Sequence, residues 1–144
     1  MKKWLLLIYK IPREPTAGRV FVWRKLKQIG ALAIQDAVWI LPQSKRSAEH
    51  FQWLAAEINE LGGETMVWET EPIDGNQSDE LQKRFTDLIE AEYKEIEIAL
   101  KRKDRDLTAL SKRFQEVGNR DFFKTEIGIQ VREKLLKASE GRKK

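Results

Sequence analysis

The chain opens with an apolar run, a proline-rich turn and an amphipathic segment. Trp4–Tyr9 is apolar at every position, which is typical of a central strand covered on both faces. Pro12 and Pro15 follow and interrupt regular structure, because proline lacks the backbone N–H that helices and strand ladders use. Residues 16–29 then carry apolar side chains at helical spacing, and Gly30 is expected to end the helix. This opening predicts a strand followed by a helix.

The predicted helix is expected to bury one side. Thr16 is its expected N-cap. The side chains placed on the inner side by helical spacing are Val22, Trp23, Leu26 and Ile29. Arg19 is expected on this inner side too, at the first turn, whereas Arg24 is expected to project outward. Val20 and Phe21 are turned partly away from the inner side, and exposed apolar residues beside charge mark a candidate partner surface.

Further patterned segments complete a first domain. Residues 31–34 and 38–41 predict two short strands, residues 46–61 predict a helix ended by Gly62-Gly63, and residues 65–68 predict a fourth strand. The order β-α-β-β-α-β is the split βαβ pattern of a ferredoxin-like domain. In that fold the first and third strands are central, and here they are the two most apolar runs. We therefore predict an α+β fold with a ferredoxin-like domain.

The rest of the chain is patterned as helices. Ser78 is expected to cap a helix that runs to about Arg102. The inner stripe expected along it consists of Leu81, Phe85, Leu88, Ile96 and Leu100. Residues 107–117 and 125–139 predict two more helices. The helix that ends at about Arg102 and the helix at 107–117 are expected to form a helical hairpin. Residues 141–144 are expected to fray.

Two domains are therefore predicted within 144 residues. Residues 1–73 form the ferredoxin-like α/β sandwich, and residues 74–144 form a C-terminal helical extension packed on it or on a dimer partner. No apolar run approaches the roughly 18 residues that cross a bilayer, and the chain has no cysteine. We expect a cytoplasmic protein without a membrane span.

Groups suited to catalysis are scarce in this sequence. His50 is the only histidine, and its place near a helix start favours a structural or surface role. The acidic residues follow no metal-ligand spacing, and no glycine-rich phosphate loop is present. We expect no catalytic residue, no metal site and no cofactor. The five tryptophans lie one per early element, which favours core or interface packing over a stacking platform for bases: Trp4, Trp23, Trp39, Trp53 and Trp68.

Charge is distributed unevenly along the chain. Residues 1–40 carry eight Lys or Arg against two acids, residues 41–100 carry five against fourteen, and residues 101–144 carry fourteen against seven. A concentration of positive charge on a folded element suggests a surface for polyanions. The alternative is that the acidic middle segment neutralises the basic ends within one fold or across a dimer.

The first basic segment holds the candidate binding residues. No acid lies between residues 15 and 35 to pair with its cations at helical spacing. The residues predicted to contact DNA phosphates are Lys10, Arg13, Arg19, Arg24, Lys25 and Lys27. Arg19 and Lys10 are also the candidates for holding a small oxyanion at the helix start, with Arg19 tying the turn to the sheet as the structural alternative. A homodimer is expected, because Val20 and Phe21 add to an apolar first strand and because the long helices carry wide apolar stripes.

The segment WLLLIYKIPREPTAGRVFVWRKLKQIGALAIQDAVWILP, with WLAAEINELGGE at residues 53–64, resembles the ChrB N-terminal domain family of chromate-resistance regulatory proteins. The resemblance covers most of the chain and implies a DNA-binding transcriptional regulator that takes duplex DNA as its partner. In that family arginines of the first helix are thought to contact DNA, and they match Arg19 and Arg24 here. The family's chromate response is associated with a second, C-terminal domain that this sequence does not include, so the resemblance leaves open whether this chain recognises chromate.

Two functions besides DNA-binding regulation remain open, a nuclease or its remnant and a scaffold module. The stretch around Ile34–Trp39 has a fainter, fold-level likeness to the ferredoxin-like subunit of CRISPR spacer acquisition and to the middle domain of phenylacetate-catabolism repressors. The CRISPR relatives place a metal-binding Asp at the end of the first strand, where this chain has Lys10. A cation there disfavours a metal-dependent nuclease, although a non-catalytic remnant of one fits. The third possibility is a dimerisation or scaffold module.

Overall fold

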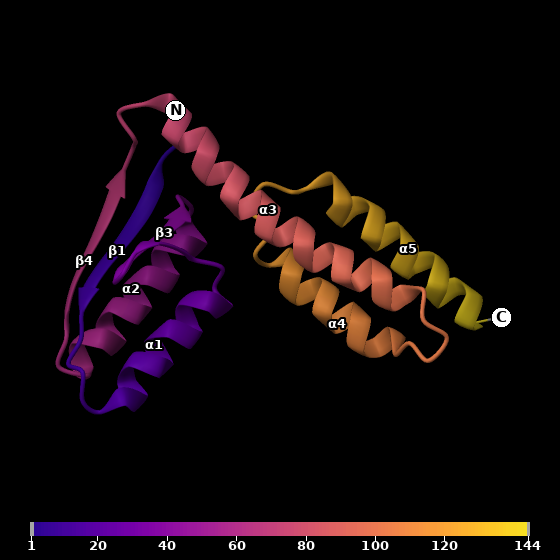
Figure 1. Ribbon diagram of the computed structural model, residues 1–144, viewed down its shortest axis with the longest axis horizontal. Helices are drawn as coiled ribbons and strands as arrows, with labels where there is room; N and C mark the ends of the chain where they lie inside the picture. Colours follow the sequence, from indigo (N-terminus) through magenta and orange to yellow (C-terminus); the bar gives the residue numbers. More distant parts are fainter. Residues whose placement is uncertain (1, 144) are drawn as a thin grey trace. The chain divides into compact units, whose positions relative to one another are not determined.

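The structure is a computed structural model that describes residues 2–143. The chain divides into two compact units, Met1–Ser78 and Asp79–Lys144. Helices dominate the second unit, whereas the first combines helices with a sheet (Figure 1). None of the helices described is both long and apolar enough to cross a membrane.

The first unit is a four-stranded antiparallel sheet with two helices on one face (Figure 1). Its elements are β1 (Trp4–Lys10), α1 (Thr16–Gln28), β2 (Leu32–Gln35), β3 (Val38–Pro42), α2 (Lys45–Glu60) and β4 (Glu64–Thr70). The strands lie in the order β2-β3-β1-β4, so β1 and β3 are central. The α+β class is confirmed, whereas the finer ferredoxin-like assignment stays a prediction.

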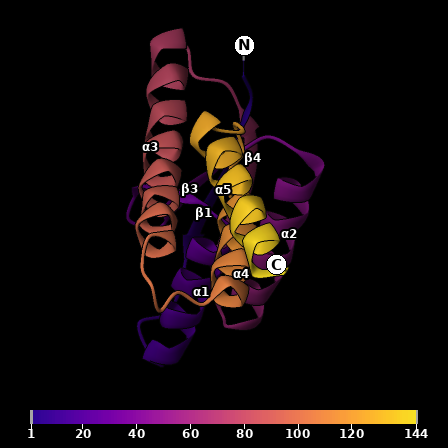
Figure 2. The same cartoon turned by 90° about the vertical axis from the view of Figure 1, so that its right-hand side faces the viewer.

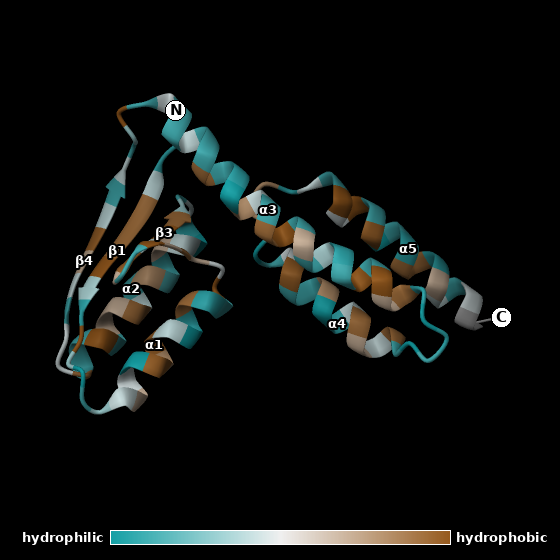
Figure 3. Cartoon of the chain, viewed as in Figure 1, coloured by the Kyte–Doolittle hydropathy of each residue, from teal (hydrophilic) through white to brown (hydrophobic). Residues whose placement is uncertain are grey.

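The core of this unit lies between the sheet and the helices. Side chains alternate across a strand, so Leu5 and Leu7 of β1 face the helices and are almost fully buried. The helices meet them with inner stripes that are equally buried: Val22 and Leu26 from α1, and Phe51, Leu54 and Ile58 from α2. Each such side chain contributes roughly 1.5–3 kcal/mol of hydrophobic stabilisation. The brown β1 of Figure 3 marks this central strand as the most apolar part of the sheet.

The tryptophans were expected in the core or at an interface, and two of the five lie in the core. Trp4 and Trp39 are buried, whereas Trp23, Trp53 and Trp68 are each about half exposed. Trp23 was expected beside Val22 on the inner side of α1. Successive helical residues point about 100° apart, so with Val22 facing the sheet the indole of Trp23 falls on the flank.

The end of α2 passes very close to the end of β1. Gly62 adopts a left-handed backbone with φ of 86°, which ends the helix as expected of Gly62-Gly63. Gly63 then lies so near β1 that a Cβ atom there would stand 2.5 Å from the carbonyl oxygen of Lys10 and 2.7 Å from Cγ2 of Ile58. The absence of a side chain at Gly63 thus permits β4 to enter the sheet beside β1.

The second unit contains the bundle of α3 (Gly75–Leu100), α4 (Leu107–Gly118) and α5 (Glu126–Lys143), with α3 beginning in the first unit. The three helices lie side by side in both views (Figures 1 and 2). The core cluster of the bundle consists of Ile89, Tyr93, Ile96, Leu100, Leu107, Val117, Val131 and Leu135. The inner stripe of α3 therefore runs through Ile89 and Tyr93, and the predicted Leu88 is more than half exposed.

Two predicted helix ends are corrected. Ser78 is not the cap of α3: the helix begins at Gly75, where the Asp74 Oδ1 accepts a hydrogen bond from the amide of Asn76 at 2.9 Å. Ser78 is instead buried inside the helix and accepts a hydrogen bond from the indole Nε1 of Trp4 at 2.7 Å. The segment expected to fray from Gly141 continues α5 to Lys143; Lys144 lies outside the described residues.

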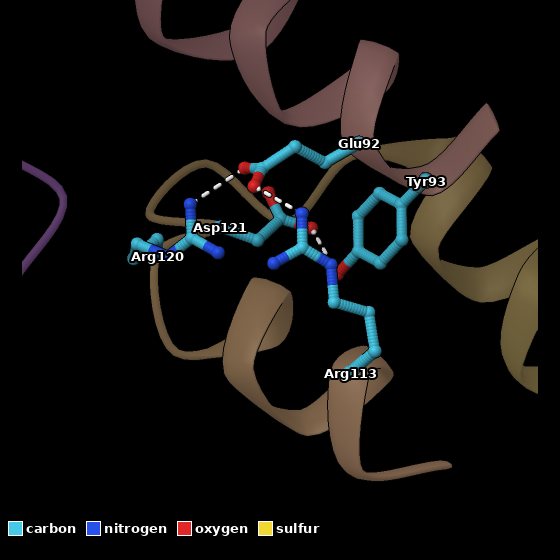
Figure 4. Close-up of polar contacts among 5 residues, drawn as sticks. All are labelled: Glu92, Tyr93, Arg113, Arg120 and Asp121. Atoms are coloured by element: carbon cyan, nitrogen blue, oxygen red, sulfur yellow. Dashed lines mark hydrogen bonds and ion pairs between the residues drawn. The ribbon is translucent and has the colours of Figure 1, made fainter. Parts of the chain in front are cut away.

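A polar cluster centred on Asp121 joins the α4–α5 loop to α3 (Figure 4). Its Oδ2 accepts hydrogen bonds from the Tyr93 hydroxyl at 3.2 Å and from the Thr125 hydroxyl at 3.0 Å, and its Oδ1 accepts from the Thr125 amide at 3.0 Å. Burial, and then the nearby charge of Asp121, raise the pKa of Tyr93 well above its ordinary value. Tyr93 therefore keeps its proton and serves as a donor.

The same end of α3 carries a second carboxylate with two arginine partners. Glu92 binds Arg113 of α4 at 2.8 Å and Arg120 of the α4–α5 loop at 2.6 Å (Figure 4). All three side chains are partly shielded from solvent, which strengthens these pairs relative to fully exposed ones. Together with Asp121, Glu92 holds α4 and its following loop against α3.

Replacing Gly63 is expected to destabilise the first unit. In Gly63→Ala the new methyl group would collide with the backbone of Lys10, so β1 and β4 would have to separate locally. We expect a loss of about 2–4 kcal/mol in the free energy of unfolding, measured by urea denaturation. Gly75→Ala is the control, because a Cβ there meets nothing within 4 Å and should cost no stability. Equal denaturation midpoints for the two variants would contradict the close approach.

The hydroxyl of Tyr93 is expected to make stability depend on pH at high pH. The folded pKa is raised above the ordinary value of about 10, so its contribution is complete below pH 10 and is lost as pH rises toward the folded pKa. The free energy of unfolding should therefore fall more steeply above about pH 10 in the native protein than in Tyr93→Phe. Tyr9→Phe, which leaves Tyr93 in place, should keep the steep fall. Parallel profiles for native protein and Tyr93→Phe would refute this assignment.

Candidate nucleic-acid interface

Three cations of α1, Arg19, Arg24 and Lys27, are exposed, whereas Lys25 is half-buried. Val22 and Leu26 are fully buried and fix the inner side, so Arg24, on the opposite side, is exposed together with Lys27. The first turn of α1 contains no acidic residue, and the last turn contains Lys25 and Lys27. We call the surface made of Arg19, Arg24, Lys25, Lys27 and the ring of Trp23 the α1 face. This surface is positive because nothing on its own helix neutralises it.

Lys25 lies between the two helices and against two aromatic rings. Its Nζ is 5.8 Å from the ring centroid of Phe21 and 5.7 Å from that of Trp53 on α2. The two rings are themselves in tilted contact, with centroids 6.4 Å apart. Cation–π attraction of about 0.5–1 kcal/mol at such partly exposed sites orients the ammonium group. Phe21 thus contacts Trp53 and Lys25 of the same chain and is no longer part of the predicted partner surface. Val20 is the other residue of that surface, and it is 40% exposed.

A second lysine–tryptophan pair lies on the other flank of α1. The Nζ of Lys27 is 5.7 Å from the ring centroid of Trp23, and this indole is 52% exposed. Trp53 is 48% exposed beside Lys25. Exposed indoles next to cations are the side chains on which nucleic-acid bases and sugars pack. The i, i+4 spacing of Trp23 and Lys27 could have pointed to this pair, whereas the pairing of Lys25 with Trp53 depends on how α1 and α2 pack.

The other predicted cations are less concentrated. Lys10 is exposed at the end of β1 and lies opposite Glu64 of β4 in the strand register, and Arg13 is exposed next to Glu14 in the turn. An opposite charge across a strand pair partly neutralises a cation. Lys10 and Arg13 are therefore weaker candidates for phosphate contacts than the α1 cations.

The structure does not support the predicted oxyanion site. Arg19 is exposed, not turned inward, and among the described residues no hydrogen bond or ion pair joins it to Lys10. The N-cap of α1 is Pro15, not Thr16, and it provides no side-chain cap. Because proline has no side-chain donor or acceptor, the residue at this cap adds no polar group to the predicted site. Arg19 instead extends the α1 face toward the start of the helix.

Acidic residues set the limit of the positive surface. On α2, Glu49 and Glu57 lie one helical turn on either side of Trp53, and both follow the outer side of that helix. A phosphate backbone would be repelled by these carboxylates. The surface available to a polyanion is therefore α1 itself, with Trp53 at its border.

The sheet face away from α1 and α2 forms a second distinct surface. The strand register places Leu6 beside Trp68 and Ile8 beside Met66, on the side opposite Leu5 and Leu7. Met66 and Trp68 are each more than half exposed. We call these four residues the open sheet face. Exposed apolar groups of this size often mark contact with another protein surface.

Other possible sites offer less chemistry. Among the described residues no three His, Asp or Glu side chains gather where they could hold a metal ion. His50 is half-buried on α2. Glu92 and Asp121 are already bonded to partners that tie the helices of the second unit together. The α1 face is thus the candidate site that the geometry supports best.

Comparison with known sequences places this surface within a family. A family model described as Protein ChrB, N-terminal, matches residues 19–101, which begin in α1 and end just after α3. Protein ChrB of Cupriavidus metallidurans is 28% identical over 82 residues, which is 57% of this chain and 25% of that protein. The chain thus spans about a quarter of the curated relative that it matches.

No solved structure matches the chain, so the ferredoxin-like assignment has no structural relative behind it. The family match also begins after β1 and the proline turn, although both carry part of the resemblance seen in the sequence. It includes α1 from Arg19 onward, with all the residues of the α1 face. Because the matched segment is more than half of the sequence, the chain belongs to the ChrB N-terminal family.

Proposed function

We propose that this protein is a non-catalytic, regulator-like protein that binds duplex DNA through the α1 face. The observation that carries the proposal is the position of the α1 cations. Arg19, Arg24 and Lys27 are exposed on one helix, and no acid occurs between residues 15 and 35. Cations that lack acidic neighbours gain more from phosphate contacts than cations already paired, because no existing partner has to be displaced.

The dimensions and side chains of α1 suit a duplex. At 1.5 Å per residue the helix is about 20 Å long, and a helix of this kind fits the major groove of B-DNA or lies along its backbone. Arg24 and Lys27 would contact phosphates, and Trp23 would pack against sugars beside them. These contacts position the protein on DNA; base readout is left unassigned.

Family membership supports a regulatory role for DNA binding. The sequence resembles regulators of chromate resistance, and the first-helix arginines of those proteins match Arg19 and Arg24. Both arginines are exposed here, as a contact with DNA requires. Chromate recognition is not part of the proposal, since the resemblance gives no residue of this chain for it.

The nuclease alternative receives less support. Its metal site would need a carboxylate at the end of β1, where this chain has Lys10 opposite Glu64. A single carboxylate beside a lysine is a poor ligand set for a divalent cation. The proposed function is therefore binding without catalysis.

We also propose that the protein is a homodimer joined through the open sheet face. The sequence favoured a dimer partly because Val20 and Phe21 were expected to be exposed. Phe21 instead contacts Trp53 of the same chain, so it gives less support for a dimer. The support now comes from Met66 and Trp68, whose exposed area lies away from the α1 face, across the sheet. A two-fold contact through this face would leave both α1 faces available to DNA.

Removing one cation from the α1 face is expected to weaken DNA binding. If its four cations each neutralise a phosphate, the slope of log affinity against log salt is about −3 to −4. Arg24→Ala should cost about 1–2 kcal/mol of binding and reduce the slope by about one, measured by fluorescence anisotropy with a labelled duplex. Arg132→Ala, an exposed arginine on α5, should change neither quantity. A salt slope near zero for the native protein, or equal losses in the two variants, would contradict the proposal.

Charges placed on the open sheet face are expected to separate the dimer. In the double variant Met66→Glu, Trp68→Glu, like charges would meet across the two-fold contact, so light scattering at micromolar concentration should give the monomer mass. The native protein should give twice that mass. Trp23→Glu, which alters an equally exposed indole on α1, should remain dimeric. A monomeric native protein, or a double variant that stays dimeric, would show that this face is not the interface.

A further inference from the structure

A pocket in the second unit gathers cations from two separate segments. Its lining comes from the α3–α4 loop, the start of α4 and the last turns of α5. These segments lie at one end of the bundle (Figures 1 and 2). Its volume is about 890 Å³, and Arg102, Lys103, Arg105 and Lys137 line it. Figure 3 shows this loop as hydrophilic along its length. Ligand pockets commonly have volumes of about 300–1,000 Å³.

The positive charge of this pocket exceeds what the helix ends explain. Cations are favourable near helix C-termini, and α3 and α5 both end here with about −0.5 charge each. The start of α4 contributes about +0.5, so the helix ends together offset about half of one cation. The single acid of the lining, Asp106, accepts a hydrogen bond from the amide of Ala109 at 3.1 Å as the N-cap of α4. At least two cationic charges are left over.

One of these cations is held in place before any ligand arrives. The Nη1 of Arg105 donates to the carbonyl oxygen of Leu100 at 2.7 Å, which fixes the guanidinium group beside the end of α3. A guanidinium carries five N–H donors, so this contact uses only part of its capacity. The adjacent Leu107 belongs to the core of the bundle and gives the pocket a rigid wall. Arg105 is thus oriented to bind an anion with little further loss of side-chain freedom.

We propose that this pocket binds a ligand carrying two or more adjacent phosphate groups. Several cations spread around one pocket match several linked anionic groups better than one, and arginine suits the geometry of phosphate oxygens. The same chemistry is presented by a small polyphosphate compound and by successive phosphates of a nucleic-acid backbone. The site lies in the second unit and does not depend on the α1 face.

Inorganic tripolyphosphate is the probe that tests this site on the full chain. Isothermal titration should show saturable binding by the native protein, and Lys137→Ala should weaken it roughly tenfold, as expected for loss of one charge-assisted hydrogen bond. Lys103→Ala is a second pocket variant on another segment and should weaken binding similarly, so the result does not depend on one variant folding normally. Lys94→Ala removes an exposed lysine of α3 outside the pocket and should bind like the native protein.

Duplex DNA distinguishes the two sources of phosphate. If Lys137→Ala binds DNA with native affinity, the ligand is a small polyphosphate compound; if its DNA affinity also falls, the pocket holds the nucleic-acid backbone. Either result supports the site, provided that tripolyphosphate binding falls. The proposal is overturned if the native protein does not bind tripolyphosphate, or if Lys94→Ala weakens binding as much as the pocket variants. Tripolyphosphate binding is tested by the pocket variants and DNA binding through α1 by Arg24→Ala, so the two proposals fail separately.

Discussion

The burial of β1 in the middle of the sheet determines how the first unit presents its charge. Leu5 and Leu7 are buried on the face of the sheet that the two helices cover, and Val22 and Leu26 are buried on α1. Once these two residues face inward, the geometry of a helix turns Arg24 and Lys27 toward solvent. The close passage of Gly63 beside Lys10 keeps β4 next to β1 and so maintains this central position. The positive surface is thus a consequence of core packing.

The sequence was sufficient to predict what depends on local pattern. The six elements of the first unit and the three helices of the second follow from apolar periodicity and from stop signals such as Gly30 and Gly62. It was insufficient where tertiary packing decides between neighbouring positions. Trp23 differs from Val22 by one helical step, yet one is exposed and the other buried. Ser78 was predicted to be a helix cap, but its hydroxyl accepts a hydrogen bond from the indole of Trp4, which is distant in sequence.

The sequence predicted which cations belong to the candidate site better than it predicted how they are arranged. The four α1 cations could be named because acids are absent around them, and the structure leaves all but Lys25 well exposed. The predicted oxyanion site assumed an inward Arg19, whereas Arg19 is exposed and Lys10 lies opposite Glu64. The partnership of Lys25 with Trp53 needed the α1–α2 contact, which no single segment encodes. Charge along the chain is therefore resolved into two separate positive surfaces, one in each unit.

The indole signals of the five tryptophans offer the most direct test of where DNA binds. In a two-dimensional ¹H–¹⁵N spectrum each indole N–H gives its own peak, and a duplex can be titrated into the protein. Binding through the α1 face predicts that the peaks of Trp23 and Trp53 move while those of the buried Trp4 and Trp39 stay. The peak of Trp68, on the open sheet face, should stay as well. Movement of Trp68 without Trp23, or no movement at saturating DNA, would contradict the account.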